Sequence, residues 1–158
     1  MDSEYFKVKK QKAEEIYTAQ KTIYSPYFKS NVSLNSNGFH HLQFSARRER
    51  PKEEQVLKFT LLPLALKIIK QATTLQEYRK LLCPVGKQTN TGSRIMKMVE
   101  WWGFVAIFIE RDIKVRVVLR RVGDGNITFW SVMPYAKFRK NNSGESKQKL
   151  YMEGIEDE

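Results

Sequence analysis

The chain has 158 residues, of which 41% are hydrophobic, so it can form one domain with a packed core, and this composition excludes a disordered or fibrous protein. It carries 28 Lys and Arg against 17 Asp and Glu, a formal net charge of +11. A charge of this size favours a polyanionic partner, either nucleic acid or an acidic protein.

The cysteine content and the hydropathy pattern are typical of a protein of the reducing cytoplasm. Cys83 is the single cysteine, which excludes an internal disulfide and a zinc site built on several cysteines. The N-terminal residues contain no apolar leader segment, and no later stretch has the length of a membrane span. We therefore expect a cytoplasmic protein with no membrane partner.

Helical patterns dominate the first half of the chain. Residues 9–23 predict a modest helix that must end before Pro26, and residues 27–34 predict an edge strand closed by turn-forming residues. After Pro51 a long helix is predicted, in which Pro63 indicates either a kink or two abutting helices. The apolar stripe of this helix is expected to cover a sheet, with Lys58 among the charged residues placed elsewhere; the stripe consists of Leu57, Leu61, Leu64, Ala65 and Ile68.

A weaker helix signal and a loop come next. Thr74-Leu75-Gln76-Glu77 matches a capping box, which predicts a short helix from Tyr78 to Leu82 that Pro84 ends. Residues 85–93 are typical of a loop, and their glycines and lysine do not follow the order of a phosphate-binding loop. Residues 104–109 form an apolar run that is typical of a strand buried on both faces.

The strand predicted over residues 113–120 has one apolar face and one mostly cationic face. Ile113, Val115, Val117 and Leu119 alternate with Lys114, Arg116, Val118 and Arg120. The cationic face is suited to bind anions, although exposed edge strands also carry such charges to prevent aggregation. Both interpretations remain open at this point.

A hairpin turn at residues 123–126 joins this strand to the last one. A turn of two residues, Asp124 and Gly125, puts Arg120 opposite Phe129 and Val118 opposite Ser131, so that Ser131 lies on the cationic face. A turn of three residues puts Thr128 and Trp130 on that face instead, and the sequence leaves both registers open. In either register a hydroxyl group joins the arginines.

Two adjacent histidines, His40 and His41, complete a set that can cleave RNA without a metal ion. The reaction needs a base for the proton of the 2′-hydroxyl, cations to hold the phosphate, and an acid for the leaving 5′ oxygen. Histidine can transfer protons near neutral pH, and the planar guanidinium of arginine suits phosphate. A histidine beside Phe39 and Leu42 can equally be a structural hydrogen-bonding residue. No metal site is expected, because no nearby cysteine or pair of carboxylates completes one.

The candidate residues divide into two groups. The candidate catalytic residues are His41, Arg120 and Ser131, with His40 and Tyr135 as further candidates. His41 is preferred to His40 because the following Leu42 indicates the start of an ordered segment. The candidate RNA-binding residues are Arg47, Lys114, Arg116, Arg121, Thr128 and Trp130.

The order of these motifs resembles the barnase/EndoU/colicin/RelE superfamily of metal-independent nucleases, and within it the small domains, many of them toxins, found on phages and mobile elements. The resemblance covers residues 31–135 and rests on Gly38-Phe39-His40-His41-Leu42, the basic residues 47–52, LLPLA, TTLQEYR and GNITFWSVMP. It implies that the histidine following Gly38-Phe39 is catalytic, that the strand arginines clamp phosphate, and that Ser131 is the last-strand hydroxyl. The chain lacks the C-terminal histidine that barnase-like members use as acid, and Tyr135 is a candidate replacement.

We therefore predict an α+β fold with N-terminal helices packed on a curved antiparallel sheet, a single nuclease-like domain over residues 1–140, and a mobile acidic tail over residues 141–158. The leading hypothesis is a metal-independent RNA endonuclease without a cofactor, a bacterial toxin that cuts tRNA or mRNA and is restrained by an antitoxin or immunity protein. One alternative is a non-catalytic nucleic-acid-binding module that stacks bases on Trp101, Trp102, Trp130 and Tyr135. The other is an interaction protein that docks an acidic partner.

Overall fold

The computed structural model describes the backbone of residues 1–140 and 146–150 and the side chains of residues 1–135. Within this part of the chain the helices are α1 (Ser3–Thr18), α2 (Ser36–Gln43) and α3 (Lys52–Gln71). The strands are β1 (Thr22–Ser25), β2 (Ser30–Ser33), β3 (Glu77–Val85), β4 (Ile95–Phe108), β5 (Ile113–Val122), β6 (Thr128–Lys140) and β7 (Ser146–Leu150), and a 3-10 turn, η1 (Ile109–Arg111), joins β4 to β5. The tail expected over residues 141–158 lies outside the described residues, except for β7, whose backbone pairs with β6.

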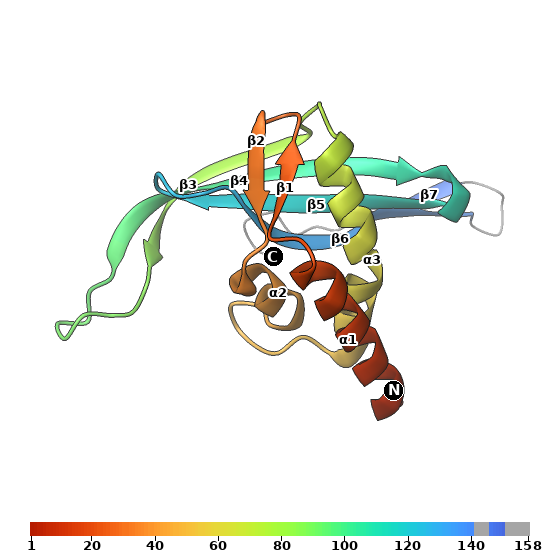
Figure 1. Cartoon of the computed structure of the whole chain (residues 1–158), viewed down its shortest axis with the longest axis horizontal. Helices are drawn as coiled ribbons and strands as arrows, with labels where there is room; N and C mark the ends of the chain where they lie inside the picture. The colour runs from red at the N-terminus through yellow and green to blue at the C-terminus, as the bar shows by residue number, and fades with distance from the viewer. Residues whose placement is uncertain (141–145, 151–158) are drawn as a thin grey trace.

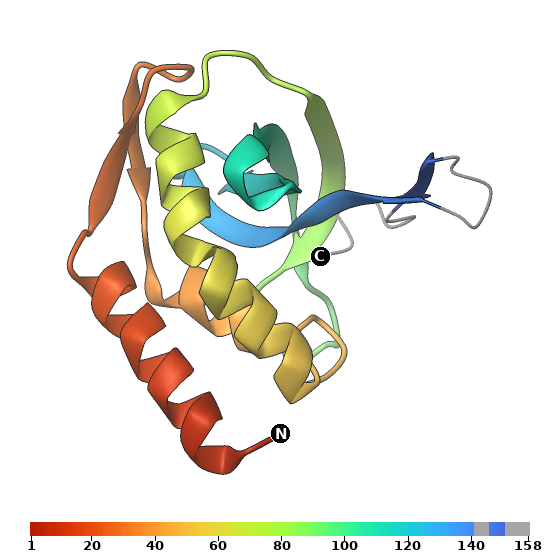
Figure 2. The same ribbon diagram turned by 90° about the vertical axis from the view of Figure 1, so that its right-hand side faces the viewer.

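One sheet contains all of these strands, in the order β1-β2-β6-β5-β4-β3, with β7 added on β6. Neighbouring strands run antiparallel, apart from the short parallel contact of β2 with β6 at Ser33 and Thr128. The long strands cross the molecule with the helices gathered on one side of them (Figure 1). The sheet curls around α3, so that the helix lies between the β1–β2 hairpin and the long strands (Figure 2). The predicted α+β fold with N-terminal helices on a mostly antiparallel sheet is therefore confirmed.

Helix α3 supplies most of the helical side of the core, and it is one helix with Pro63 inside it, not two abutting helices. Leu61, Leu64, Ala65 and Ile68 are buried as the apolar stripe predicts. The predicted stripe is wrong at its first residue, because Leu57 is 37% exposed while its neighbour Lys58 is only 2% exposed. Lys58 Nζ donates hydrogen bonds to Ser131 Oγ (3.1 Å) and to the Val132 carbonyl (2.9 Å), which offset the cost of burying an ammonium group. Among the described residues, no helix is both long and apolar enough to cross a bilayer.

The short helix predicted from Tyr78 to Leu82 is wrong, because these residues belong to strand β3. Strand β3 pairs with β4 over its whole length, from Glu77 opposite Gly103 to Val85 opposite Ile95. A four-residue capping pattern contributes only about 1 kcal/mol, so a ladder of hydrogen bonds along nine residue pairs decides the conformation. The loop predicted over residues 85–93 then becomes the tip of a long β3–β4 hairpin.

Strands β5 and β6 combine both registers that the sequence left open. Near the turn Arg120 pairs with Thr128, which is the register of a three-residue turn. Farther along, Val118 pairs with Ser131, which is the register of a two-residue turn. The register shifts between Val118 and Leu119, where a bulge inserts Trp130 as an extra residue on β6. A bulge redirects the side chain that it inserts, and this one brings the Trp130 ring into contact with Arg120.

Helix α2 is short, so its position depends on its cap and on close packing. The Asn35 side chain accepts a hydrogen bond from the Gly38 amide (3.0 Å), and the Tyr17 hydroxyl donates to the Asn35 carbonyl. The residues predicted as a turn after β2 therefore begin a helix. Gly38 lies directly against β6, because a Cβ atom placed there would stand 2.5 Å from the Phe129 carbonyl oxygen. This contact holds the histidine-bearing helix against the sheet.

Replacing Gly38 with alanine is expected to destabilise the fold by about 1–3 kcal/mol, because the added methyl group overpacks a contact with backbone that cannot move aside. Thermal or urea unfolding measures the change. Ser36→Ala, on the exposed first turn of the same helix, is the control and should unfold close to wild type. Equal stability of wild type and Gly38→Ala would show that α2 is not packed as described.

Candidate functional site

A cleft of about 400 Å³ lies between α2 and the sheet. Helix α2 and the loop after it provide one wall, and β4, β5 and β6 provide the other. The lining residues are Asn37, His40, His41, Phe44, Ser45, Ala46, Trp101, Arg120 and Trp130. Four of the residues singled out in the sequence as catalytic or RNA-binding candidates therefore meet here, from segments far apart in the chain: His40, His41, Arg120 and Trp130.

Arg120 is the central cation of this cleft. Its guanidinium carbon lies 4.1 Å from the centre of the Trp130 ring and 6.0 Å from that of Trp101. Its Nε is buried and has no hydrogen-bond partner among the described residues. Burial lowers the pKa of Arg120 from its ordinary value, because the surrounding rings cannot replace the water that a charged group loses. The group nevertheless remains charged near neutral pH.

Two buried arginines and the partly exposed Arg121 have carboxylate partners in the described part of the chain. Arg50 binds Glu54 (2.9 Å), Arg116 binds Glu77 (3.3 Å) and Arg121 binds Glu100 (2.6 Å). Arg120 has no ion-pair partner among the described residues. A half-buried cation of this kind is suited to bind an anion that comes from outside the protein.

Trp101 is the second residue of the cleft with an unmatched polar group. The side chain is 5% exposed, and its Nε1 has no hydrogen-bond partner among the described residues. A buried donor without an acceptor costs about 1–3 kcal/mol, so two such donors beside one cleft are a marked local cost. Sites of this kind are common where a ligand completes the structure.

His41 is buried and held on several sides. Its ring stacks on Trp130 at 4.1 Å between centroids and 20° between planes. Arg50 donates from Nε to the His41 carbonyl (3.0 Å) and from Nη2 to the His41 Nε2 (3.3 Å). Because a guanidinium can only donate, Nε2 is the acceptor in this contact. His41 therefore forms a fixed wall of the cleft.

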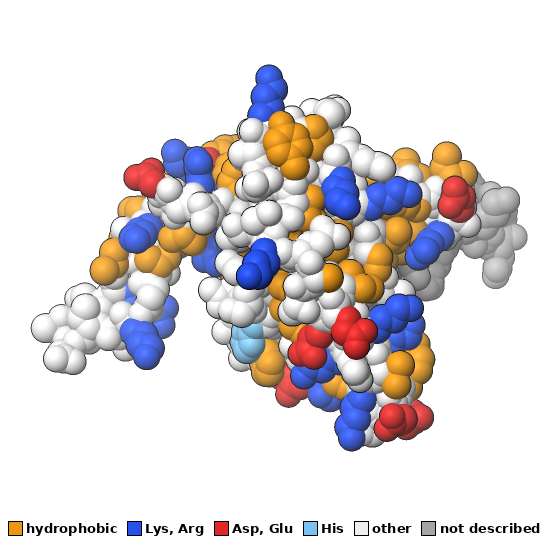
Figure 3. All heavy atoms as spheres, in the orientation of Figure 1, with side chains coloured by type: hydrophobic (Ala, Val, Ile, Leu, Met, Phe, Trp, Pro, Cys, Tyr) orange, Lys and Arg blue, Asp and Glu red, His pale blue; other side chains and the backbone are white. Residues whose placement is uncertain are grey.

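His40 is exposed and lies at the mouth of the same cleft. Its ring stacks on Phe44 at 4.5 Å between centroids and 12° between planes. A histidine side chain is visible on the surface in Figure 3, in pale blue, in the region where Figure 1 shows α2. The stacking fixes the plane of the His40 ring while leaving its edge open to solvent, which is the geometry that a proton-transfer group needs.

Two candidate catalytic residues lie outside the cleft. Ser131 is fully buried and accepts the hydrogen bond from Lys58, so the expected convergence of Ser131 with His41 and Arg120 does not occur. The bulge at Trp130 is the physical reason, since it brings the tryptophan to the place where the hydroxyl was expected. Tyr135 lies near Lys114, whose Nζ is 5.1 Å from the ring centre, and near Arg116 (5.6 Å).

The remaining RNA-binding candidates lie around the cleft or away from it. Arg47 is exposed in the loop that follows the cleft residue Ala46. The Thr128 hydroxyl donates to the Arg120 carbonyl (3.1 Å) and so fixes the strand beneath the arginine. Arg116 is only 2% exposed, so the face predicted to be cationic along its whole length is partly covered. Arg121 lies over the Trp102 ring, at 5.6 Å, and outside the cleft.

Two residues that shape the site were not predicted from the sequence. Arg50 belongs to the charge-dense segment 47–52, but nothing in its spacing indicates that it reaches the His41 ring. Phe44 was not among the candidate residues, and its stacking on His40 follows from the four-residue spacing of a helix that was not predicted. Among the described residues, no group of three or more His, Cys, Asp or Glu is arranged to hold a metal ion.

No protein-family model, curated protein or solved structure matches this chain. The resemblance to the barnase/EndoU/colicin/RelE superfamily therefore stays a prediction from sequence motifs, and the function is argued from the cleft itself.

Proposed function

We propose that the protein is an RNA endonuclease that cuts without a metal ion, and that the cleft between α2 and the sheet is its active site. The observation that carries the proposal is Arg120, a half-buried cation with no ion-pair partner among the described residues, placed between tryptophan rings and beside two histidines. A phosphate supplies the missing anion, and an unpaired base supplies a flat surface for the aromatic side chains.

Each side chain has a distinct role in this proposal. His40 takes the proton of the 2′-hydroxyl, and the resulting oxygen attacks the neighbouring phosphorus. Arg120 stabilises the negative charge that builds on the phosphate oxygens in the transition state. The bond from phosphorus to the 5′ oxygen then breaks, and that oxygen takes a proton from water or from the protonated His40. The products are a 2′,3′-cyclic phosphate and a free 5′-hydroxyl.

The assignment of proton transfer to His40 reverses the preference drawn from the sequence. It is supported by exposure, because His40 reaches solvent while His41 is 5% exposed. It is also supported by the contact between Arg50 and His41 Nε2, which occupies one of the two ring nitrogens that could take a proton. In this account His41 positions Trp130, and Trp130 positions Arg120.

The proposal also implies where the enzyme acts and what restrains it. An RNA endonuclease of this kind works in the cytoplasm as a toxin against tRNA or mRNA, and the cell that makes it needs an antitoxin or immunity protein. The net charge of +11 supports binding to the RNA backbone.

The test is to incubate purified protein with total RNA in EDTA and to sequence the new RNA ends. We expect cuts at a limited set of positions. A preparation of Arg120→Gln, purified in the same way, controls for contaminating nuclease and should cut the RNA far more slowly. Cutting that is equal in both preparations would contradict the proposal.

A second candidate function is non-catalytic binding of single-stranded nucleic acid. The observation that favours it is the aromatic lining of the cleft by Trp101, Trp130 and Phe44, since stacking on such rings requires no chemistry. The same incubation, with binding of the RNA measured alongside cleavage, separates the two functions. RNA that is bound but remains uncut supports the second candidate and excludes the first.

A further inference from the structure

The β3–β4 hairpin extends beyond the rest of the molecule (Figure 1). We call residues 79–99 the arm; it consists of the outer parts of β3 and β4 and the loop between them. Large apolar side chains on the arm are open to solvent: Leu81 (41%), Leu82 (59%), Ile95 (63%), Met96 (50%) and Met98 (39%). Figure 3 shows hydrophobic and cationic side chains side by side over this hairpin. Contiguous exposed apolar surface of this kind marks an interaction site.

The strand register shows how these side chains are arranged. Leu82 pairs with Met98, and Pro84 pairs with Met96, so the four side chains form an apolar row on one face of the arm. Methionine is flexible and can adapt its shape to a partner. The row is therefore suited to receive the apolar side chains of an extended segment.

Strand β3 is also an edge of the sheet. It ends the strand order, so its outer N–H and C=O groups have no strand partner among the described residues. Proteins usually protect such an edge by keeping it short or by covering it. Here it runs for nine residues and carries Leu81 and Leu82. An unpaired edge of this length can accept an added strand.

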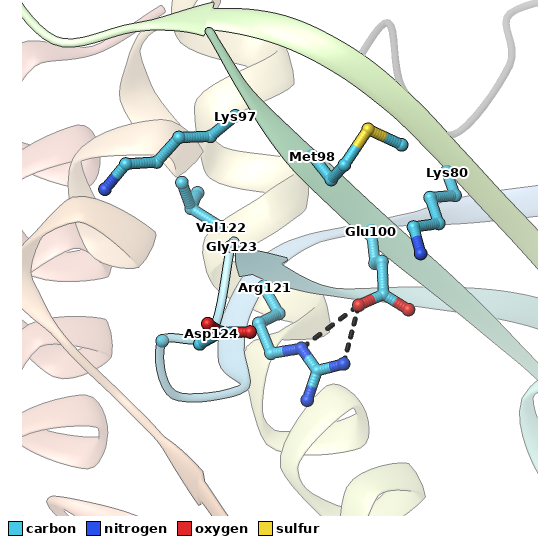
Figure 4. A pocket seen from close by; sticks show the side chains of 9 residues that line it. Lys80, Lys97, Met98, Glu100, Arg121, Val122, Gly123 and Asp124 are labelled. Atoms are coloured by element: carbon cyan, nitrogen blue, oxygen red, sulfur yellow. Dashed lines mark hydrogen bonds and ion pairs between the residues drawn. The ribbon is translucent and has the colours of Figure 1, made fainter. Parts of the chain in front are cut away.

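The charge of the arm identifies the chemistry of its partner. The arm carries Arg79, Lys80, Lys87, Arg94 and Lys97, and it contains no Asp or Glu. At its base lies a hollow of about 670 Å³, in which Arg121 is bound to Glu100 while Lys97 extends away from this pair (Figure 4). Lys80 and Lys97 line the same hollow and can bind carboxylates of a partner. An acidic partner is therefore favoured, and like charges oppose the pairing of two arms from two copies of this chain.

A protein partner fits the arm better than nucleic acid does. Sequence-tolerant binding of single strands depends on aromatic rings that stack on bases. Residues 79–99 contain no Phe, Tyr or Trp, and their large exposed apolar side chains are leucine, isoleucine and methionine. Such side chains gain most from apolar side chains of another protein.

We propose that the edge of β3 docks an acidic segment of another protein as an added strand. Apolar side chains of that segment extend the apolar row beside Leu82, and its carboxylates bind the cations of the arm, Lys80 on the face of the row and Lys97 on the opposite face. The docking surface is separate from the cleft of Arg120, since the two share no lining residue. The inference therefore does not depend on the proposed nuclease activity.

The probe is a synthetic peptide of about ten residues that alternates Glu with Val and Leu, a length matched to the strand. Its binding is measured by fluorescence anisotropy in the absence of RNA. We expect saturable binding that weakens about tenfold or more in the double variant Leu82→Ser with Met96→Ser. The control is Ile107→Ser, which removes an apolar side chain that is 65% exposed outside the arm and should leave binding unchanged.

Two comparison peptides and one physical measurement decide the mechanism. A peptide of glutamate alone, and the alternating peptide with N-methyl groups along one edge, should both bind much more weakly. Equal binding of either one would overturn the added strand. Sedimentation of the free protein as a dimer that Leu82→Ser with Met96→Ser dissociates would assign the arm to a second copy instead. Loss of RNA binding in the double variant, with peptide binding unchanged, would assign it to RNA.

Discussion

Replacing Arg120 with glutamine is expected to slow RNA cleavage by about a hundredfold or more, as the loss of a preorganised transition-state donor does elsewhere. The reason is that Arg120 is the phosphate-binding cation in the proposed mechanism, and glutamine keeps a polar side chain without the charge. The rate is measured on a labelled RNA oligonucleotide with enzyme in excess, so that the chemical step is observed. Arg120→Lys keeps the charge but loses the planar fork, and it should give an intermediate rate.

The matched control for this experiment is Arg121→Gln. Arg121 is the next residue on the same strand, and its charge is already paired with Glu100 outside the cleft. Both variants lose one positive charge, so any general weakening of RNA binding should be similar in the two. Cleavage at equal rates by Arg120→Gln and Arg121→Gln, with both proteins folded, would show that the phosphate is held elsewhere.

Replacing His40 and His41 separately with alanine is expected to give opposite results. His40→Ala should slow cleavage by about 10²- to 10⁴-fold, the usual loss on removing a general base, while the thermal midpoint changes little because the side chain is exposed. His41→Ala should instead lower the stability by about 1–3 kcal/mol, because Arg50 loses an acceptor in a buried position and Trp130 loses its stacking partner.

The comparison requires both the cleavage rate and the unfolding curve of each variant. Asn37→Ala, at the exposed edge of the cleft, is the control for removing a cleft side chain that has no proposed role in proton transfer. The opposite pattern, with a stable and inactive His41→Ala and an active His40→Ala, would return the proton-transfer role to His41. The sequence alone favoured that assignment.

The long elements could be predicted from the sequence because their patterns are repeated over many residues. The leucine stripe of α3 and the alternation over β5 each contain several independent signals, and both elements are present. The helix predicted from Tyr78 to Leu82 is wrong because it rested on a short local pattern. Pairing with β4, which comes later in the chain, decides the conformation of these residues. The burial of Lys58 was not predicted because it depends on hydrogen-bond acceptors that Ser131 and Val132 provide from a distant strand.

The candidate site was predictable in its residue types and less so in its geometry. The cleft brings together three residues that were candidates from the sequence, His41, Arg120 and Trp130. The register near Ser131 depends on a bulge, which hydrophobic alternation cannot reveal. The different environments of His40 and His41 follow from a helix of eight residues and from Arg50, and neither feature has a pattern long enough to recognise.

The central claim is that the cleft uses the 2′-hydroxyl of the RNA itself to break the chain. The most direct measurement compares two oligonucleotides in EDTA, an all-RNA strand and the same strand with a single 2′-deoxy nucleotide at the mapped cut position. We expect the first to be cut, leaving a 2′,3′-cyclic phosphate, and the second to bind with similar affinity and stay intact at that position. Cleavage of the deoxy-substituted strand at the same position would contradict the account.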